Sequence, residues 1–301
     1  MRYAMFSTGD DPAPRLAVVH AGGIADVQKL LAGSGPAPRT VLELVQSGRD
    51  GWRRTAERLG AKLSEKSFAG GPADVHWHAP IPRPLKNIVC LGLNYASHVR
   101  ETTSADKPVK VPEIPVFFTK ASTSASGPYD PMPWDTSATS QVDYEAELGV
   151  IVGIGGKNIK RGAALDHVFG YTVINDVSAR DLQFGHKQWF KGKSLDGFCP
   201  MGPVVVTSDE FGDPQKKRIT LRINGETRQD ATTGDMLFPV NIILEYLSQG
   251  MTIEAGDIIA TGTPDGVGLG RTPPEYLKDG DIVETEIEGI GKLRNSVVRL
   301  A

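Results

Sequence analysis

Residues 143–152 read Asp-Tyr-Glu-Ala-Glu-Leu-Gly-Val-Ile-Val, so three acids at alternate positions run into an apolar segment. The apolar half predicts a buried β-strand. Because side chains alternate along a strand, Asp143, Glu145 and Glu147 share one face, about 6–7 Å apart. Carboxylates entering a core are costly without a partner, and neither this segment nor its immediate flanks contain Lys or Arg. Two interpretations stay open: a site for a hard divalent cation such as Mg²⁺ or Ca²⁺, or an edge strand with solvated acids.

The composition is that of an ordinary globular protein. The chain has 301 residues, a formal net charge of −3 and 40% hydrophobic residues, enough for one large core or two domains. No basic stripe predicts nucleic-acid binding, and no apolar run of about 18 residues predicts a membrane span. The N-terminal residues lack the apolar region of a signal peptide, and Cys90 and Cys199 are expected to be reduced core thiols. We therefore expect a cytoplasmic protein.

The first 80 residues differ in pattern from the rest. They contain one strand pattern and two helix patterns without a convergent polar cluster, which favours a packing or oligomerisation module. The Pro-rich segment at 79–84 predicts a boundary, because Pro fixes φ and cannot continue regular pairing. We expect a small N-terminal α/β domain over residues 1–80 and a second domain over residues 81–301.

The second domain is predicted to be mostly strand. Turn signals separate short apolar segments, and Asn224-Gly225 is typical of a hairpin. One helix is expected at Val240–Leu247, where apolar residues recur at helical spacing. Many short strands with few helices favour a mostly β, α+β fold of the sandwich or barrel type. The expected strands are 87–91, 116–118, 148–152, 168–174, 204–206, 219–223, 257–261 and 281–287.

Asp176 is a candidate partner for the acidic face. It follows the apolar strand 168–174, where a strand gives way to a turn or helix. It can cap the following turn. Beside Glu145 and Glu147 it can also serve as a third ligand, and three carboxylates with water suit Mg²⁺ or Mn²⁺.

A His–Glu pair is a candidate for acid–base chemistry. A short helix is expected to begin at Asn94, which places His98 and Glu101 at i and i+3 on one face. A carboxylate bonded to imidazole fixes its tautomer and raises its basicity, as a water-activating base requires. An idle surface pair is the alternative. The polar run Thr102–Pro108 lacks apolar periodicity and predicts a mobile loop able to act as a lid.

Two further segments bear polar groups. Lys187, Lys191 and Lys193 can bind an anionic substrate or transfer a proton, or form a solvated cationic face. The Gly-rich loop 261–270 lacks the features of a phosphate-binding loop and of a dinucleotide fingerprint. Its N–H groups and the Thr263 hydroxyl can still hold a carboxylate.

Five ordered motifs make residues 80–301 resemble the fumarylacetoacetate hydrolase superfamily. They are Gly92-x-Asn94-Tyr95-x-x-His98, Glu145-x-Glu147-Leu148, Asn175-Asp176-x-Ser178-Ala179-Arg180-Asp181, Lys193-Ser194 and Gly256-Asp257-x-Ile259-x-Thr261-Gly262-Thr263-Pro264-x-Gly266-Val267-Gly268. The first 80 residues resemble only the small N-terminal domain that many bacterial members carry. The resemblance implies a mixed β-sandwich roll and a homodimer.

The resemblance also implies a metal site. Glu145, Glu147 and Asp176 are expected to hold Mg²⁺, with Mn²⁺ or Ca²⁺ as alternatives, whereas Asp143 is expected not to be a ligand. The larger hydrolase of tyrosine breakdown uses a fourth carboxylate that has no counterpart here. The chain therefore resembles the shorter, three-ligand branch.

The remaining site residues are implied in the same way. His98 with Glu101 resembles a lid-borne dyad that activates water, and Lys193 resembles the lysine that orients this water or supplies a proton. The expected substrate-contacting residues are Arg180, Gln183 and Thr263.

The implied substrate is a small 2-oxo or 2,4-dioxo acid. Our leading hypothesis is hydrolysis of a C–C bond in an acylpyruvate-type 2,4-dioxo acid, through a metal-stabilised enolate and a dyad-activated water. Decarboxylation of oxaloacetate and isomerisation of 2-hydroxyhepta-2,4-diene-1,7-dioate are the alternatives, and the decarboxylation uses the same enolate without an attacking water. A metal-dependent binding protein for 2-oxo acids is the non-enzymatic alternative.

Overall fold

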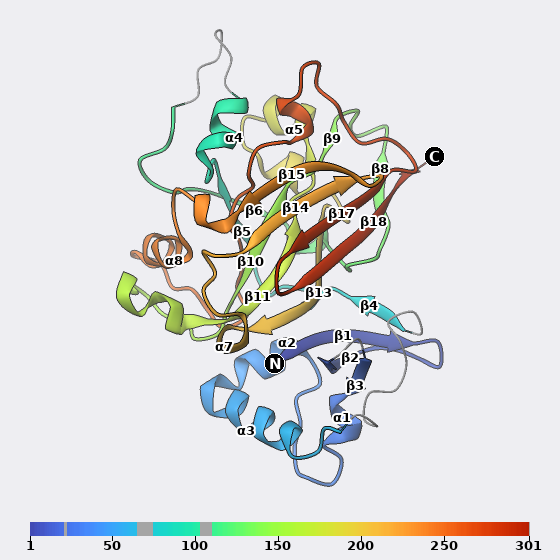
Figure 1. Cartoon of the computed structure of the whole chain (residues 1–301), viewed down its shortest axis with the longest axis vertical. Helices are drawn as coiled ribbons and strands as arrows, with labels where there is room; N and C mark the ends of the chain where they lie inside the picture. The colour runs from blue at the N-terminus through green and yellow to red at the C-terminus, as the bar shows by residue number, and fades with distance from the viewer. Residues whose placement is uncertain (21–22, 65–74, 103–109, 301) are drawn as a thin grey trace.

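The computed structural model describes residues 1–20, 23–64, 75–102 and 110–300. Figure 1 shows a strand-rich body with the N-terminal helices α1–α3 at one end of the long axis and α4 and α5 at the other. This confirms the predicted strand-dominated α+β fold. Part of the predicted mobile loop, residues 103–109, lies outside the described residues.

The strands are short and distributed along the whole chain. They are β1 (Arg2–Thr8), β2 (Asp11–His20), β3 (Gly23–Asp26), β4 (His76–His78), β5 (Ile88–Gly92), β6 (Val116–Lys120), β7 (Ala125–Ser126), β8 (Met132–Asp135), β9 (Val142–Asp143), β10 (Ala146–Val152), β11 (Val168–Asn175), β12 (Ser178–Ala179), β13 (Cys199–Thr207), β14 (Arg218–Ile223), β15 (Glu226–Thr232), β16 (Ile258–Ala260), β17 (Ile282–Ile287) and β18 (Gly291–Leu300).

The helices are mostly brief. They are α1 (Val27–Leu30), α2 (Val41–Gln46), α3 (Gly48–Gly60), α4 (Ala96–Glu101), α5 (Arg180–Gly185), α6 (Phe190–Lys193), α7 (Ser208–Phe211) and α8 (Val240–Ser248), with 3-10 turns at Ser122–Ser124, Arg161–His167, Thr233–Asp235 and Gly268–Gly270. Among the residues that the structure describes, no helix is both long enough and apolar enough to span a membrane.

Two large sheets dominate the fold. The larger has eleven strands, in the order β3-β2-β1-β13-β11-β10-β16-β5-β6, with β4 on β1 and β7 on β13. The smaller has the order β15-β14-β17-β18-β8. Every residue of β10 and β11 is buried. The acidic strand is therefore central, and the edge-strand interpretation of residues 143–152 is wrong.

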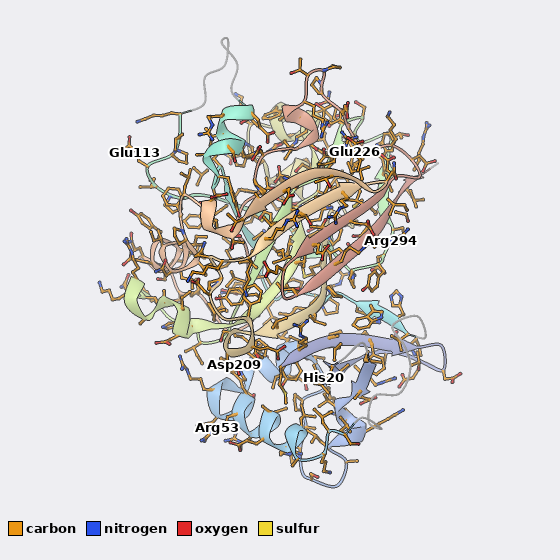
Figure 2. All side chains as sticks on the ribbon, viewed as in Figure 1. His20, Arg53, Glu113, Asp209, Glu226 and Arg294 are labelled. Atoms are coloured by element: carbon orange, nitrogen blue, oxygen red, sulfur yellow. The ribbon has the colours of Figure 1, made fainter. Side chains whose placement is uncertain are left out.

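The N-terminal strands continue the larger sheet. Strand β1 pairs with β13, with Arg2 opposite Val206, a connection that the sequence patterns do not predict. Trp52 on α3 packs edge-on against Phe169 of β11, with ring centroids 5.0 Å apart. Where α3 meets α7, Arg53 and Asp209 (Figure 2) line a cavity of about 450 Å³. The domain boundary near residue 80 and the homodimer stay predictions.

Several local predictions are confirmed. Asn224 and Gly225 join β14 to β15 with φ of 51° and 84°, the left-handed pair that a tight hairpin turn requires. Helix α8 covers the predicted 240–247 segment. Cys90 and Cys199 are free and buried.

Candidate metal centre and active site

Three predicted carboxylates meet at one buried point. Glu147 lies on β10, Glu145 directly precedes it, and Asp176 directly follows β11. Antiparallel pairing of β10 with β11 brings these positions together. One oxygen of each carboxylate lies within 4.8 Å of the others, and all three side chains are buried.

Glu147 provides a test of whether a cation fits this cluster. Its Oε2 accepts the Gly262 N–H at 2.8 Å, whereas its Oε1 is buried without a hydrogen-bond partner. Burial, together with the like charges of Asp176 and Glu145, raises the pKa of Glu147 well above its usual range. An orphaned buried oxygen is costly, and a hard divalent cation with oxygen ligands would satisfy it. The donor set therefore fits Mg²⁺, Mn²⁺ or Ca²⁺.

Three buried cations surround the carboxylates. Lys193 Nζ donates to Glu145 Oε2 at 2.6 Å and to Asp176 Oδ2 at 2.8 Å. Lys120 Nζ donates to Asp176 Oδ1 at 2.5 Å, and Arg180 Nη1 lies 2.8 Å from Glu145 Oε1. Burial alone would raise the pKa of Glu145, but Lys193 and Arg180 outweigh it and lower the pKa to about 2. Glu145 is therefore held ionised.

The predicted dyad is formed and anchored. His98 Nδ1 lies 2.7 Å from Glu101 Oε1, and Glu101 Oε2 accepts the Gly266 N–H at 2.7 Å. Glu101 thus ties α4 to the Gly-rich loop. The His98 and Glu101 side chains are only 9% and 15% exposed, so the interpretation as an idle surface pair is wrong.

The predicted helix cap at Asn94 is wrong. Helix α4 begins at Ala96 with Tyr95 at the cap position. The Asn94 amide nitrogen donates to Thr261 O at 2.7 Å, and its Oδ1 accepts the Phe238 N–H at 2.8 Å. Thr261, which follows β16, and Phe238, which precedes α8, hold this side chain across long sequence separations, so a local cap rule could not place it.

The other predicted site residues gather in one cavity of about 610 Å³ beside the triad. Gln183 Oε1 accepts from Arg180 Nη1 at 3.0 Å, and Arg180 Nη2 is buried without a partner. Of the three lysines considered above, Lys187 and Lys191 are exposed, and only Lys193 is buried in the site. The predicted residues that line the cavity are His98, Glu101, Glu145, Arg180, Gln183, Lys193 and Thr263.

Sequence reasoning missed two supporting residues, Lys120 and Gln229, and assigned no role to Asp143. Lys120 ends an apolar strand, and this placement was the only local signal for it. Gln229 lies on a hairpin strand without such a signal, yet it donates to Thr263 Oγ1 at 2.9 Å and accepts the Ala146 N–H. Asp143 accepts from Arg180 Nε at 2.8 Å and from two loop N–H groups. Asp143 is not part of the group of carboxylate oxygens within 4.8 Å of one another, which consists of Glu145, Glu147 and Asp176.

We expect Asp143→Asn to raise KM about 10- to 100-fold, the effect of losing charge-assisted hydrogen bonds that orient Arg180. The asparagine amide would face donors from Arg180, Gly268 and Leu269. Steady-state kinetics at saturating Mg²⁺ check this. Asp181→Asn is the matched control, because Asp181 anchors Thr139 and Ser140 away from the cavity. Equal effects of the two substitutions would contradict the assignment.

Comparisons with known proteins agree on one family. The family model described as "Fumarylacetoacetate (FAA) hydrolase C-terminal" matches residues 87–298. The chain is 48% identical over 231 residues to the oxaloacetate tautomerase YisK of Bacillus subtilis, covering 77% of this chain and 76% of that protein. It is 39% identical over 302 residues to the mitochondrial oxaloacetate tautomerase FAHD2A of Bos taurus, covering 99% and 92%. The solved fumarylacetoacetate hydrolase of Exiguobacterium antarcticum covers all of both chains, with a TM-score of 0.82 and 43% identity.

Proposed function

This chain belongs to the fumarylacetoacetate hydrolase family, and from that premise we propose that it interconverts the keto and enol forms of oxaloacetate or a related 2-oxo acid, using a divalent metal ion. The relatives named oxaloacetate tautomerase favour enolate chemistry without an attacking water over the hydrolysis that sequence analysis placed first. One observation carries the proposal: Glu145, a member of the buried carboxylate triad, and the His98–Glu101 dyad line the same cavity. Such an arrangement combines stabilisation of enolate charge with proton transfer.

Each group has a role in this reaction. Glu145, Glu147 and Asp176 would hold the metal ion, which when bound supplies positive charge that stabilises an enolate. Arg180 would bind a substrate carboxylate through Nη2, which has no protein partner. The interaction of His98 Nδ1 with Glu101 leaves Nε2 available as the base.

The proton transfers balance without a further reactant. His98 Nε2 removes a proton from C3 of the keto form, and the C–H electron pair becomes the C2=C3 double bond. The carbonyl pair moves to the C2 oxygen, which takes a proton from the Lys193 ammonium. One conversion from keto to enol leaves His98 protonated and Lys193 neutral, and proton exchange with solvent water returns both residues to their starting states. The conversion from enol to keto uses the same transfers in reverse.

The test supplies the enol form of oxaloacetate to the Mg²⁺-loaded protein and follows the loss of its ultraviolet absorbance. We expect this loss to exceed the spontaneous rate, without accumulation of pyruvate. Pyruvate released from oxaloacetate would instead support decarboxylation. A tautomerisation rate equal to that without protein would exclude the proposal.

Hydrolysis of an acylpyruvate C–C bond is the second candidate. The observation that favours it is the anchored dyad, because Glu101 holds the His98 ring through Nδ1 and is itself fixed by the Gly266 N–H. Acetylpyruvate cleavage, measured under the same Mg²⁺ condition, separates the two. Cleavage of acetylpyruvate faster than tautomerisation of oxaloacetate would make hydrolysis the leading candidate.

A further inference from the structure

We infer that the outer part of the active-site cavity is a subsite for an apolar tail, so that this enzyme takes 2-oxo acids bearing an alkyl or aryl group. The inference rests on the proposed function, since it assigns the far end of the same substrate. It concerns the apolar side chains that β5, β6, α5 and the residues next to them contribute to the cavity.

The cavity is larger than oxaloacetate requires. At about 30 Å³ for each water-sized group, 610 Å³ holds roughly twice as many such groups as oxaloacetate has non-hydrogen atoms. One wall of the cavity is apolar apart from the Trp189 indole N–H, and it consists of Leu91, Leu93, Phe118, Phe184, Trp189 and Leu269. Polar groups elsewhere in the lining include Thr102, Arg271 and Thr272.

Trp189 is held against the backbone of β5. A Cβ atom at Gly92 would lie 2.3 Å from an indole carbon, so only glycine leaves room for the ring. Trp189 meets Phe118 edge-on at 5.2 Å, and Lys193 Nζ lies 5.2 Å from the Phe118 ring centroid. The aromatic wall therefore begins directly beside the polar centre, at the point where the tail of a bound 2-oxo acid would extend away from that centre.

Leu93 is a second, independent observation. Its φ is 58°, in the left-handed region that branched or bulky L-residues rarely adopt. Glycine would remove the strain but would leave the cavity without this side chain. Strain of this kind is characteristic of ligand sites, and an apolar tail accounts for a leucine at this position.

Phe184 extends the apolar wall to the cavity mouth. Its side chain is 57% exposed although it lines the cavity. Exposed apolar surface that is continuous with a cavity marks a binding groove. A tail of several carbons would cover this ring.

The experiment measures binding of a matched inhibitor series to the Mg²⁺-loaded full chain by calorimetry. The probes are oxamate, N-propyloxamate, N-hexyloxamate and a counterpart of N-hexyloxamate whose chain ends in a carboxylate. We expect Kd to fall about fourfold for each added CH₂ until the tail reaches the mouth. The carboxylate-ended probe is expected to bind more weakly than N-hexyloxamate.

Variants test which side chains are responsible for the tighter binding of the alkyl oxamates. Within each variant, the ratio of the oxamate Kd to the N-hexyloxamate Kd is compared, and Trp189→Ala and Leu93→Gly are expected to reduce it at least tenfold. Leu93→Gly relieves backbone strain, so it should not lower the melting temperature. Phe190→Ala is the control, because Phe190 is an exposed neighbour that does not line the cavity. Its ratio should match that of the unmodified protein.

A series with no gain from added CH₂ groups, or tightest binding by the carboxylate-ended probe, would overturn the inference. Because this readout is binding, it is separate from the enol assay. Turnover of oxaloacetate without a tail effect removes the subsite and keeps the proposed function. A tail effect without turnover keeps the subsite and removes the proposed reaction.

Discussion

Replacing Glu147 with Gln is expected to weaken Mg²⁺ binding and lower turnover by about 100- to 1,000-fold, as loss of one partner from a buried charge cluster does. The amide oxygen of Gln can still accept the Gly262 N–H, so the side chain keeps its anchor. The amide NH₂ then replaces the unpartnered Oε1, the atom that most needs a cation. The substitution therefore removes a ligand while conserving shape.

Thermal unfolding separates loss of the metal from loss of the fold. Glu147 is buried among like charges, so the metal-free variant should be no less stable than the unmodified protein. Mg²⁺ at 100 times its Kd stabilises the unmodified protein by about 2.7 kcal/mol, and this gain should vanish in the variant. Glu254→Gln, an exposed position paired with Lys86, is the control. Unchanged Mg²⁺ affinity of Glu147→Gln, measured by calorimetry, would show that the triad is not the metal site.

Replacing His98 with Ala is expected to lower kcat for tautomerisation about 100- to 10,000-fold, the usual contribution of a positioned general base. Among the described residues, the His98 ring is bonded to Glu101 and not to Glu145, Glu147 or Asp176, so Mg²⁺ affinity should change little. The measurement is the rate of enol loss in a single turnover at saturating Mg²⁺. His186→Ala, at an exposed histidine after α5, is the control.

The companion substitution Glu101→Gln tests how the dyad is oriented. Both Glu101 oxygens accept hydrogen bonds, one from His98 and one from Gly266. In the variant, the NH₂ of the Gln amide must therefore face either the His98 N–H or the Gly266 N–H, and both of these groups are donors. We expect a smaller loss than for His98→Ala, about tenfold, because the imidazole remains. A His98→Ala variant within threefold of the unmodified rate would exclude His98 as the base, and Lys193 would then be the group to test.

The acidic face illustrates how far local patterns reach. Strand alternation placed Glu145 and Glu147 together, and the apolar segment after them predicted a strand that the structure shows to be central. Alternation alone also included Asp143. In the folded chain Arg180 and the N–H groups of Gly268 and Leu269 bond the Asp143 carboxylate across long sequence separations, and the oxygens that cluster within 4.8 Å belong to Glu145, Glu147 and Asp176.

Residues whose partners are distant were the ones that local rules missed or misplaced. Asn94 matched a helix cap, but its amide bridges Thr261 and Phe238 instead. Lys120 was missed because its partner Asp176 follows β11, which is separated from β6 in the sheet by several strands. The pairing of β1 with β13 was missed for the same reason, since strand patterns carry no information about register with a distant strand.

Local chemistry in the chain was sufficient to establish a strand-rich fold, the order of the motifs and the residue types of a carboxylate centre with a His–Glu dyad. These properties depend on periodicity and on contacts within a few residues, both of which can be read along the chain. The charge balance of the centre and the apolar wall beside it required the folded chain. Lys120 reaches Asp176, Arg180 reaches Glu145, and Lys193 reaches both carboxylates. Gly92 likewise leaves room for Trp189. Sheet pairing and packing bring these segments together although they have no local relation.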